Sequence, residues 1–147
     1  MSERSTEHAT LVLERLYEAP PERAFEAWAN PVAKQRWFGG PEIEFELDFR
    51  VGGRESSRGA TPDGRTYAYE AIYGDIVENE RIVYTYAMEI DGARFSVSVV
   101  TVEFAAADGG TRLVLTEQSV FLDRREEPGS RERGWGGLLE SLGEELG

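Results

Sequence analysis

The fold is indicated by the C-terminal stretch Gly134-Trp135-Gly136-Gly137-Leu138-Leu139, from which a helical pattern continues to the last residue. Its apolar residues recur at the i, i+3, i+4, i+7 and i+11 spacing of one helical face: Trp135, Leu138, Leu139, Leu142 and Leu146. A short helix signal ends at Ala27–Pro31, and a long series of strands and turns separates the two helices. A sheet of this length needs its apolar face covered, and only the C-terminal helix is long enough to cover it.

The C-terminal helix pattern is also rich in glycine. Gly134, Gly136, Gly137 and Gly143 would each cost about 1 kcal/mol relative to alanine inside a helix. At helical spacing, Gly136 and Gly143 flank the leucine stripe on one side and Gly134 flanks it on the other. We expect a close approach of the helix backbone to the sheet or free volume beside the helix. Alternatively, residues 134–137 form a loop that leads into the helix.

The middle of the chain alternates between apolar and polar residues with period two, which is typical of half-exposed strands. In residues 42–49, for example, Ile43, Phe45 and Leu47 alternate with glutamates. Glycine-containing turns such as Asp91-Gly92 divide the region into segments. With the strand before the first helix, this predicts about seven strands: His8–Tyr17, 42–49, the segment between Gly53 and Pro62, Thr66–Val77, Arg81–Glu89, Ala93–Ala105 and Thr111–Phe121.

Two short helical pieces interrupt this series after the first strand. Pro20-Pro21 begins the first helix, since proline is tolerated in a first turn, and Asn30-Pro31 ends it. Val32–Trp37 predicts a second, shorter helical turn. We therefore predict an α+β, helix-grip fold: a curved antiparallel sheet of about seven strands wrapped around a long C-terminal helix, with the two short helices closing one end. One domain spans residues 1–147, with residues 1–7 as a flexible N-terminus.

The composition excludes several function classes. A net charge of −12 disfavours binding to nucleic acid, which relies on an excess of Lys and Arg. The chain has no cysteine and no apolar run long enough for a membrane span. Its polar N-terminus does not resemble a signal peptide, so we expect a cytoplasmic protein. We further expect a monomer or a weak dimer.

Nucleophilic and metal chemistry are poorly supplied. The single histidine, His8, has no histidine partner for a zinc site and precedes the first strand, so we interpret it as a surface residue. The glycine pairs Gly39-Gly40 and Gly52-Gly53 lack the lysine and the spacing of a phosphate-binding loop. We predict no metal and no cofactor.

Two carboxylates fall at positions that point into the predicted core. Glu117 shares a strand face with Leu113 and Leu115, and Glu70 lies between Tyr69 and Ala71. Buried carboxylates need partners, and they cluster at functional sites, so both are candidate catalytic residues. Alternatively, a bulge or a strand end turns them to solvent.

Aromatic residues give the stronger signal for a ligand site. Tyrosines lie on neighbouring predicted strands, where their rings pack and their hydroxyl groups can hydrogen-bond. Trp37 and Phe38 adjoin the Gly39-Gly40-Pro41 break and could form a flexible lip. A pocket lined in this way suits a small hydrophobic or aromatic molecule; the alternative is an ordinary core. The predicted ligand-binding residues are Trp37, Phe38, Tyr69, Tyr73, Tyr84, Tyr86, Trp135 and Leu139.

Several short motifs, taken in order, resemble one known family. They include Glu18 to Trp28, Arg36-Trp37-Phe38-Gly39-Gly40-Pro41, Val51-Gly52-Gly53-Arg54, Asp63-Gly64-Arg65, Asn79 to Tyr86, Gly109 to Thr116 and Gly134-Trp135-Gly136-Gly137. In this order they are similar to the activator-of-heat-shock-chaperone-ATPase homologue family, within the START-like (SRPBCC, helix-grip) superfamily that includes the major birch pollen allergen. The resemblance covers roughly residues 10–146. It implies a cavity between the C-terminal helix and the concave sheet, and it transfers no catalytic residues.

Three functions are consistent with these observations. The first is binding of a hydrophobic or aromatic molecule, such as a lipid, in the cavity. The second is a cyclase, dehydratase or hydrolase that uses a cavity tyrosine and a carboxylate such as Glu117 or Glu70. The third is a chaperone cofactor with a role in stress response. An enzyme should show a convergent polar pair in the cavity, a binding module mostly apolar walls, and a cochaperone an exposed apolar patch.

Overall fold

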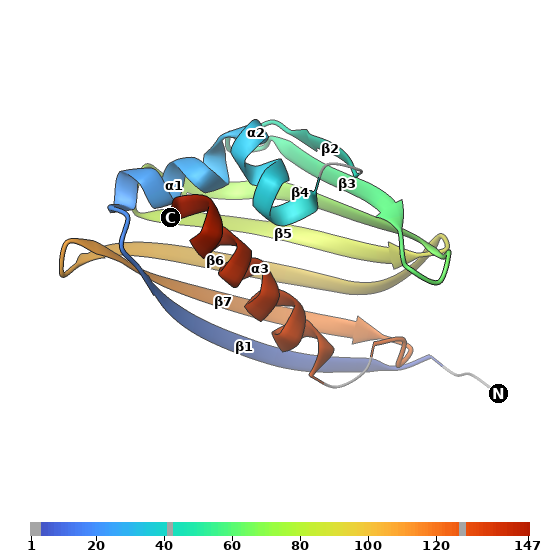
Figure 1. Ribbon diagram of the computed structural model, residues 1–147. Coiled ribbons are helices and arrows are strands. Elements are labelled where there is room, and N and C mark those ends of the chain that lie inside the picture. The colour runs from blue at the N-terminus through green and yellow to red at the C-terminus, as the bar shows by residue number, and fades with distance from the viewer. Residues whose placement is uncertain (1–3, 41–42, 127–128) are drawn as a thin grey trace.

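In a computed structural model, which describes residues 4–40, 43–126 and 129–147, the chain forms one curved sheet with helices on its concave side (Figure 1). The elements, in chain order, are β1 (Thr6–Tyr17), α1 (Pro21–Ala29), α2 (Pro31–Lys34), the π-helical turn η1 (Gln35–Gly39), β2 (Glu44–Leu47), β3 (Arg54–Ala60), β4 (Thr66–Val77), β5 (Arg81–Ile90), β6 (Ala93–Ala107), β7 (Gly110–Leu122) and α3 (Ser130–Leu146). The predicted helix-grip, α+β fold is therefore confirmed.

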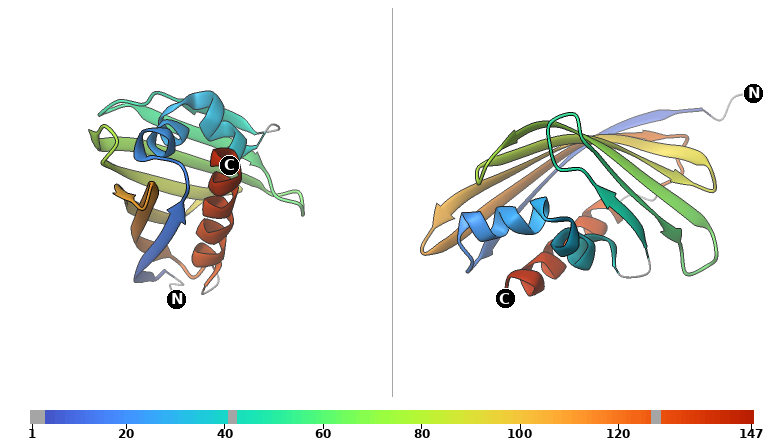
Figure 2. Two further views of the ribbon diagram at one scale, coloured as in Figure 1. Left: turned by 60° about the vertical axis from the view of Figure 1, so that its left-hand side comes forward. Right: turned by 90° about the horizontal axis from the view of Figure 1, so that it is seen from above.

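Over the described residues the sheet has seven strands in the order β1-β7-β6-β5-β4-β3-β2, and every neighbouring pair is antiparallel. Tight turns join β5 to β6 and β6 to β7, where Asp91 and Asp108 adopt positive φ immediately before a glycine. The register shifts between Tyr73 and Asp75 and again between Met88 and Glu89. Because such bulges bend a sheet and increase its twist, they help β4, β5 and β6 to arch over the helices (Figure 2).

The helix α3 crosses the concave face and contacts α1, η1 and β1. It buries the predicted stripe of Trp135, Leu139, Leu142 and Leu146, whereas Leu138 is only partly buried. The helix begins at Ser130, so residues 134–137 lie within it and do not form a preceding loop.

The glycines of α3 serve two different purposes. A Cβ at Gly143 would lie 3.3 Å from the ring of Tyr17, so the backbone approaches β1 closely there. Tyr17 also donates a hydrogen bond of 2.7 Å to the carbonyl of Leu139. A Cβ at Gly134 would meet no atom of the described residues within 4 Å, so this glycine leaves open volume beside the helix. Both expectations for these glycines hold, each at a different position.

A buried ion pair that the sequence pattern does not predict lies in the core. Lys34 Nζ lies 2.9 Å from Glu55 Oε1, and both side chains are 0% exposed. The hydroxyl of Tyr73 donates to the same carboxylate oxygen. The ammonium also lies 4.5 Å from the ring centre of Phe38 and 5.1 Å from that of Trp28. This pair joins α2 to β3 through the core.

The N-terminal segment differs from the expectation. Residues 1–3 lie outside the described part of the chain, but Thr6 and Glu7, expected to be flexible, pair with Leu122 and Phe121 of β7. Pro41 and the start of the predicted strand at residue 42 also lie outside the described part of the chain.

No helix within the described residues is long and apolar enough to cross a membrane. Exposed apolar side chains on β1, β4 and β6 include Val12, Ile72, Val97 and Val99.

Candidate ligand-binding site

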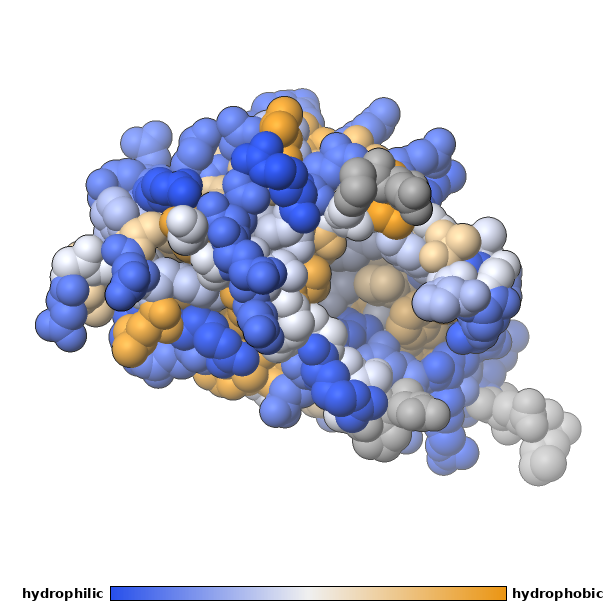
Figure 3. All heavy atoms as spheres, in the orientation of Figure 1, coloured by the Kyte–Doolittle hydropathy of each residue, from blue (hydrophilic) through white to orange (hydrophobic). Residues whose placement is uncertain are grey.

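A cavity of about 730 Å³ lies between the concave face of the sheet and the N-terminal half of α3. Figure 3 shows it as a hollow beside α3. Its volume lies within the range of about 300–1,000 Å³ that is typical of small-molecule sites. It is lined by Phe38, Ser57, Arg65, Tyr67, Tyr69, Tyr86, Met88, Phe95, Arg125, Glu126, Ser130, Arg131, Gly134, Trp135 and Leu138.

Aromatic side chains from four elements form one wall of the cavity. The ring of Tyr69 from β4 lies 4.9 Å from that of Tyr86 on β5 and 5.2 Å from that of Phe38 in η1. Phe38 in turn lies 6.3 Å from Trp135 of α3, measured between ring centres. Four of the predicted ligand-binding residues therefore lie around one space: Phe38, Tyr69, Tyr86 and Trp135.

The other predicted ligand-binding residues do not line this cavity. Tyr73, Tyr84 and Leu139 are buried in the core. Trp37 is buried as well, and its indole nitrogen donates a hydrogen bond of 2.8 Å to the carbonyl of Ala27. The expected flexible lip of Trp37 and Phe38 is thus corrected: Trp37 anchors η1 to α1, and only Phe38 reaches the cavity.

A polar network of charged and hydroxyl groups closes the inner end of the cavity. Glu117 of β7 is 1% exposed and points to the concave side, as its alternation with Leu115 predicts. The hydroxyl of Tyr86 and the indole nitrogen of Trp135, at 2.8 Å, donate to Oε1 of Glu117. Ser119, at 3.1 Å, and Arg131, at 3.2 Å, donate to Oε2. These donors occupy the lone-pair directions of the carboxylate, which acts as a fixed acceptor that connects the sheet to α3.

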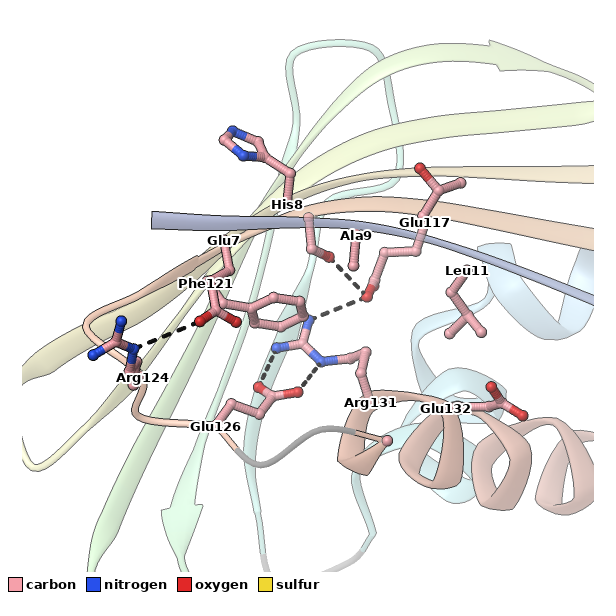
Figure 4. A pocket seen from close by; sticks show the side chains of 13 residues that line it. Glu7, His8, Ala9, Leu11, Glu117, Phe121, Arg124, Glu126, Arg131 and Glu132 are labelled. Carbon is pink, nitrogen blue, oxygen red and sulfur yellow. Dashed lines mark hydrogen bonds and ion pairs between the residues drawn. The ribbon is translucent and has the colours of Figure 1, made fainter. Parts of the chain in front are cut away.

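Arg131, in the first turn of α3, is the centre of this network (Figure 4). Its guanidinium also donates to the hydroxyls of Tyr86 at 2.6 Å and Ser96 at 3.0 Å. On its other side it forms a two-pronged pair with Glu126, with distances of 3.1 Å from Nε to Oε2 and 2.6 Å from Nη2 to Oε1. Burial disfavours the charged form, but hydrogen bonding to Glu126 and the charge of Glu117 raise the pKa of Arg131 above its ordinary value. Arg131 therefore stays a cation.

A smaller pocket of about 320 Å³ lies on the far side of this network, between β1 and the start of α3. Arg131 and Glu126 line both spaces, whereas Glu117 lines only the smaller one. His8, expected to be a surface residue, is exposed at the rim of the smaller pocket. The Arg131–Glu126 pair thus separates the two spaces.

The second candidate carboxylate does not belong to the site. Glu70 alternates to the convex face of β4, where its side chain is 53% exposed and lies 3.4 Å from Arg58. Its neighbours Tyr69 and Ala71 are the residues that point inward. The expectation that Glu70 points into the core is corrected, because strand alternation sends it to solvent.

Arg131, Glu126 and the serines around them are site residues that the sequence pattern did not predict. One signal was present in β6, where Ser96 and Ser98 are buried while Val97 and Val99 are exposed. This inverted pattern, with small polar residues inside and apolar ones outside, marks the part of the concave face that receives Arg131. Among residues 4–40, 43–126 and 129–147, no group of three metal-ligating side chains occurs.

Burial raises the pKa of the tyrosines on the concave face. Desolvation raises the pKa of Tyr69 and Tyr84 well above the ordinary value, and the charge of Glu55 adds to this effect. Desolvation and Glu117 raise the pKa of Tyr86, although Arg131 opposes them. Burial raises the pKa of Tyr17 to about 12. All of these phenols are therefore neutral at physiological pH.

We expect the free energy of unfolding to fall steeply above about pH 10, where tyrosines ionise in the unfolded chain. The folded state keeps protons on Tyr17, Tyr69, Tyr84 and Tyr86 that the unfolded state releases, so rising pH favours unfolding. Each such phenol contributes about 1.4 kcal/mol per pH unit until its own folded-state pKa is reached. Urea titrations at several alkaline pH values measure this slope. Tyr84→Phe should reduce it, and a stability that stays constant between about pH 10 and 11 would contradict the prediction.

The fold and the cavity define the class of this protein: it is a START-like (SRPBCC) helix-grip domain. The chain belongs to the Activator of Hsp90 ATPase homolog 1-like protein family, which it matches over residues 18–147. It is similar to an uncharacterised protein from Rhizobium leguminosarum (46% identity, 97% of each chain covered, TM-score 0.94). It is also similar to Mll3558 from Rhizobium loti (42% identity, 97% of this chain and 99% of that chain covered, TM-score 0.91). No curated protein matches the sequence.

Proposed function

We propose that this protein binds a small hydrophobic or aromatic molecule in the cavity between the sheet and α3. The observation that carries the proposal is the open 730 Å³ space with an aromatic wall and a hydrogen-bonding inner end. The rings of Tyr69 and Phe38 can stack on a planar ring of the ligand, and Met88 and Leu138 can contact an aliphatic group. Apolar walls with a few fixed polar groups are typical of ligand sites.

The geometry favours binding over the enzymatic alternative. A general base must present a free lone pair to the proton that it abstracts. Both oxygens of Glu117 already accept two hydrogen bonds each, and Glu70 lies on the other face of the sheet. Neither carboxylate candidate therefore supports catalysis in the cavity.

Replacing Gly134 with phenylalanine should block ligand binding without harming the fold. Gly134 lines the cavity, and an added Cβ there meets no atom of the described residues within 4 Å. The cavity therefore has room for the new ring, which would compete with a ligand for that space. We expect the affinity for a neutral fluorescent arene, phenylnaphthylamine, to fall by at least about tenfold, which corresponds to 1.4 kcal/mol. Fluorescence titration measures the affinity, and thermal unfolding checks the fold.

Gly137→Phe is the matched control. Gly137 lies in the same helix, is exposed as Gly134 is, and also has open space around its Cβ position, but it does not line the cavity. Both variants gain about 0.5 kcal/mol of helix propensity, and only Gly134→Phe should lose the probe. Equal binding by the two variants would contradict the proposal. In that case association with a chaperone, through exposed apolar residues such as Val12 and Val97, becomes the better hypothesis.

A further inference from the structure

We propose that the ligand of this cavity is a carboxylic acid with an apolar, preferably aromatic, body, and that its carboxylate takes the place of Glu126 on Arg131. The inference rests on the proposed function and adds the chemical class of the ligand. It is carried by one buried guanidinium that faces two cavities and by the unequal way in which its two carboxylate partners are held.

Arg131 is positioned to recognise a carboxylate. Its side chain is 15% exposed and contributes to the lining of both spaces, so it can be reached from the larger cavity. Hydrogen bonds to Tyr86 and Ser96 hold the guanidinium in one orientation. A fixed planar guanidinium pairs with a carboxylate through two parallel hydrogen bonds, a geometry that lysine cannot supply.

Glu126 already shows this geometry from within the chain. Its two oxygens accept from Nε and Nη2 of Arg131, as the carboxylate of a ligand would. Its side chain is 12% exposed and lines the larger cavity. Glu126 therefore marks the place where an incoming carboxylate finds its two donors.

The two carboxylate partners of Arg131 are not equally replaceable. Glu117 belongs to the central part of β7 and accepts hydrogen bonds from β5 and α3 as well, so its removal would break the packing of the sheet against the helix. Glu126 follows β7 outside the regular elements, and within the described part of the chain its other hydrogen bond comes from Ser130 at 3.0 Å. Replacement of Glu126 leaves the buried network around Glu117 intact.

The protein has a net charge of −12, so an anionic ligand depends on the local charge balance around Arg131. When a ligand carboxylate replaces Glu126, the guanidinium still has two carboxylates beside it, and Glu126 regains its hydration. Arg65 and Arg125 line the same cavity and add positive charge to it. The apolar body of the ligand would contact Phe38 and Tyr69. Burial of this apolar surface stabilises the complex, and Glu126 has no comparable apolar surface to bury.

The test compares naphthoate with naphthamide, which have the same ring system and differ in charge. Isothermal titration calorimetry at neutral pH measures both affinities. We expect the wild type to bind naphthoate more tightly, and Glu126→Gln to increase naphthoate affinity about tenfold while changing naphthamide affinity by less than about twofold. Arg131→Gln should abolish the preference for naphthoate. Arg131 also supports the fold, so a loss of binding in Arg131→Gln could follow from unfolding. The effect of Glu126→Gln on naphthoate affinity therefore decides the test.

Glu140→Gln is the charge-matched control, since Glu140 is exposed on α3 and lines neither space. It should leave both affinities unchanged. If naphthamide binds as tightly as naphthoate in the wild type and in Glu126→Gln, the inference is overturned while cavity binding stands. If neither probe binds, the proposed function fails, and this inference fails with it.

Discussion

Replacing Lys34 with methionine should lower the free energy of unfolding by about 3–5 kcal/mol. The substitution keeps an unbranched apolar stem, one atom shorter than that of lysine, but leaves the Glu55 carboxylate buried without its counter-ion. That carboxylate is removed from water, and among the described residues only the hydroxyl of Tyr73 still donates a hydrogen bond to it. Urea unfolding at neutral pH, followed by tryptophan fluorescence, measures the loss.

Two further variants test the cause of this loss. Lys34→Met combined with Glu55→Gln removes both charges and should recover most of the stability, because a neutral pair is much less costly to bury. Arg58→Met breaks the exposed Arg58–Glu70 pair, with side chains 61% and 53% exposed, and should cost at most about 1 kcal/mol. A similar small loss in Lys34→Met would show that water reaches Glu55 and that the pair is not sealed in the core.

Lys34 makes the free energy of unfolding depend on pH in the direction opposite to that of the tyrosines. Burial lowers the pKa of Lys34, and the charge and hydrogen bond of Glu55 oppose that effect. Between the lowered pKa and about 10.4, the value in the unfolded chain, the unfolded state binds more protons, so rising pH increases stability. Above that window this contribution is constant, and the tyrosines alone determine the decline.

Replacing Leu139 with alanine should cost about 2–5 kcal/mol of stability. Leu139 is 0% exposed in the centre of the face that α3 presents to the sheet, and its truncation leaves a cavity between helix and core. Thermal and urea unfolding of the variant measure the loss.

Leu138→Ala provides the comparison on the neighbouring position. Leu138 is partly buried and borders the ligand cavity, so its truncation removes less packing and enlarges an existing space. Its cost should be clearly smaller than that of Leu139→Ala. Equal losses at the two positions would mean that α3 is not anchored through the Leu139 face.

The sequence predicted the strands and the gripping helix because their patterns are local. Thr66–Val77 was predicted from its alternation and is the observed β4, and the helical spacing of Trp135, Leu139 and Leu142 identified the buried face of α3. The inward direction of Glu117 followed from the same period-two rule. Glu70 was misplaced because its strand has aromatic and aliphatic residues on both faces, which obscured the alternation.

Only the tertiary structure decided which concave residues line a cavity. Tyr69 and Tyr73 share one face of β4, yet Tyr69 borders the open space, whereas Tyr73 is buried against Phe49 and Glu55. Periodicity gives the face of a strand but not its distance from the helices that cover it. This distance depends on where α3 and η1 cross the sheet.

The ion pairs were equally inaccessible to sequence reasoning. Lys34 and Glu55 come from a short helix and a strand, and Arg131 meets Glu117 only after α3 has folded back over β7. A charged residue carries no local signal of its burial, because burial is favourable only where a distant partner supplies the opposite charge. The sequence by itself therefore determined the elements and their faces, whereas the tertiary structure alone determined the cavity and the charges at its inner end.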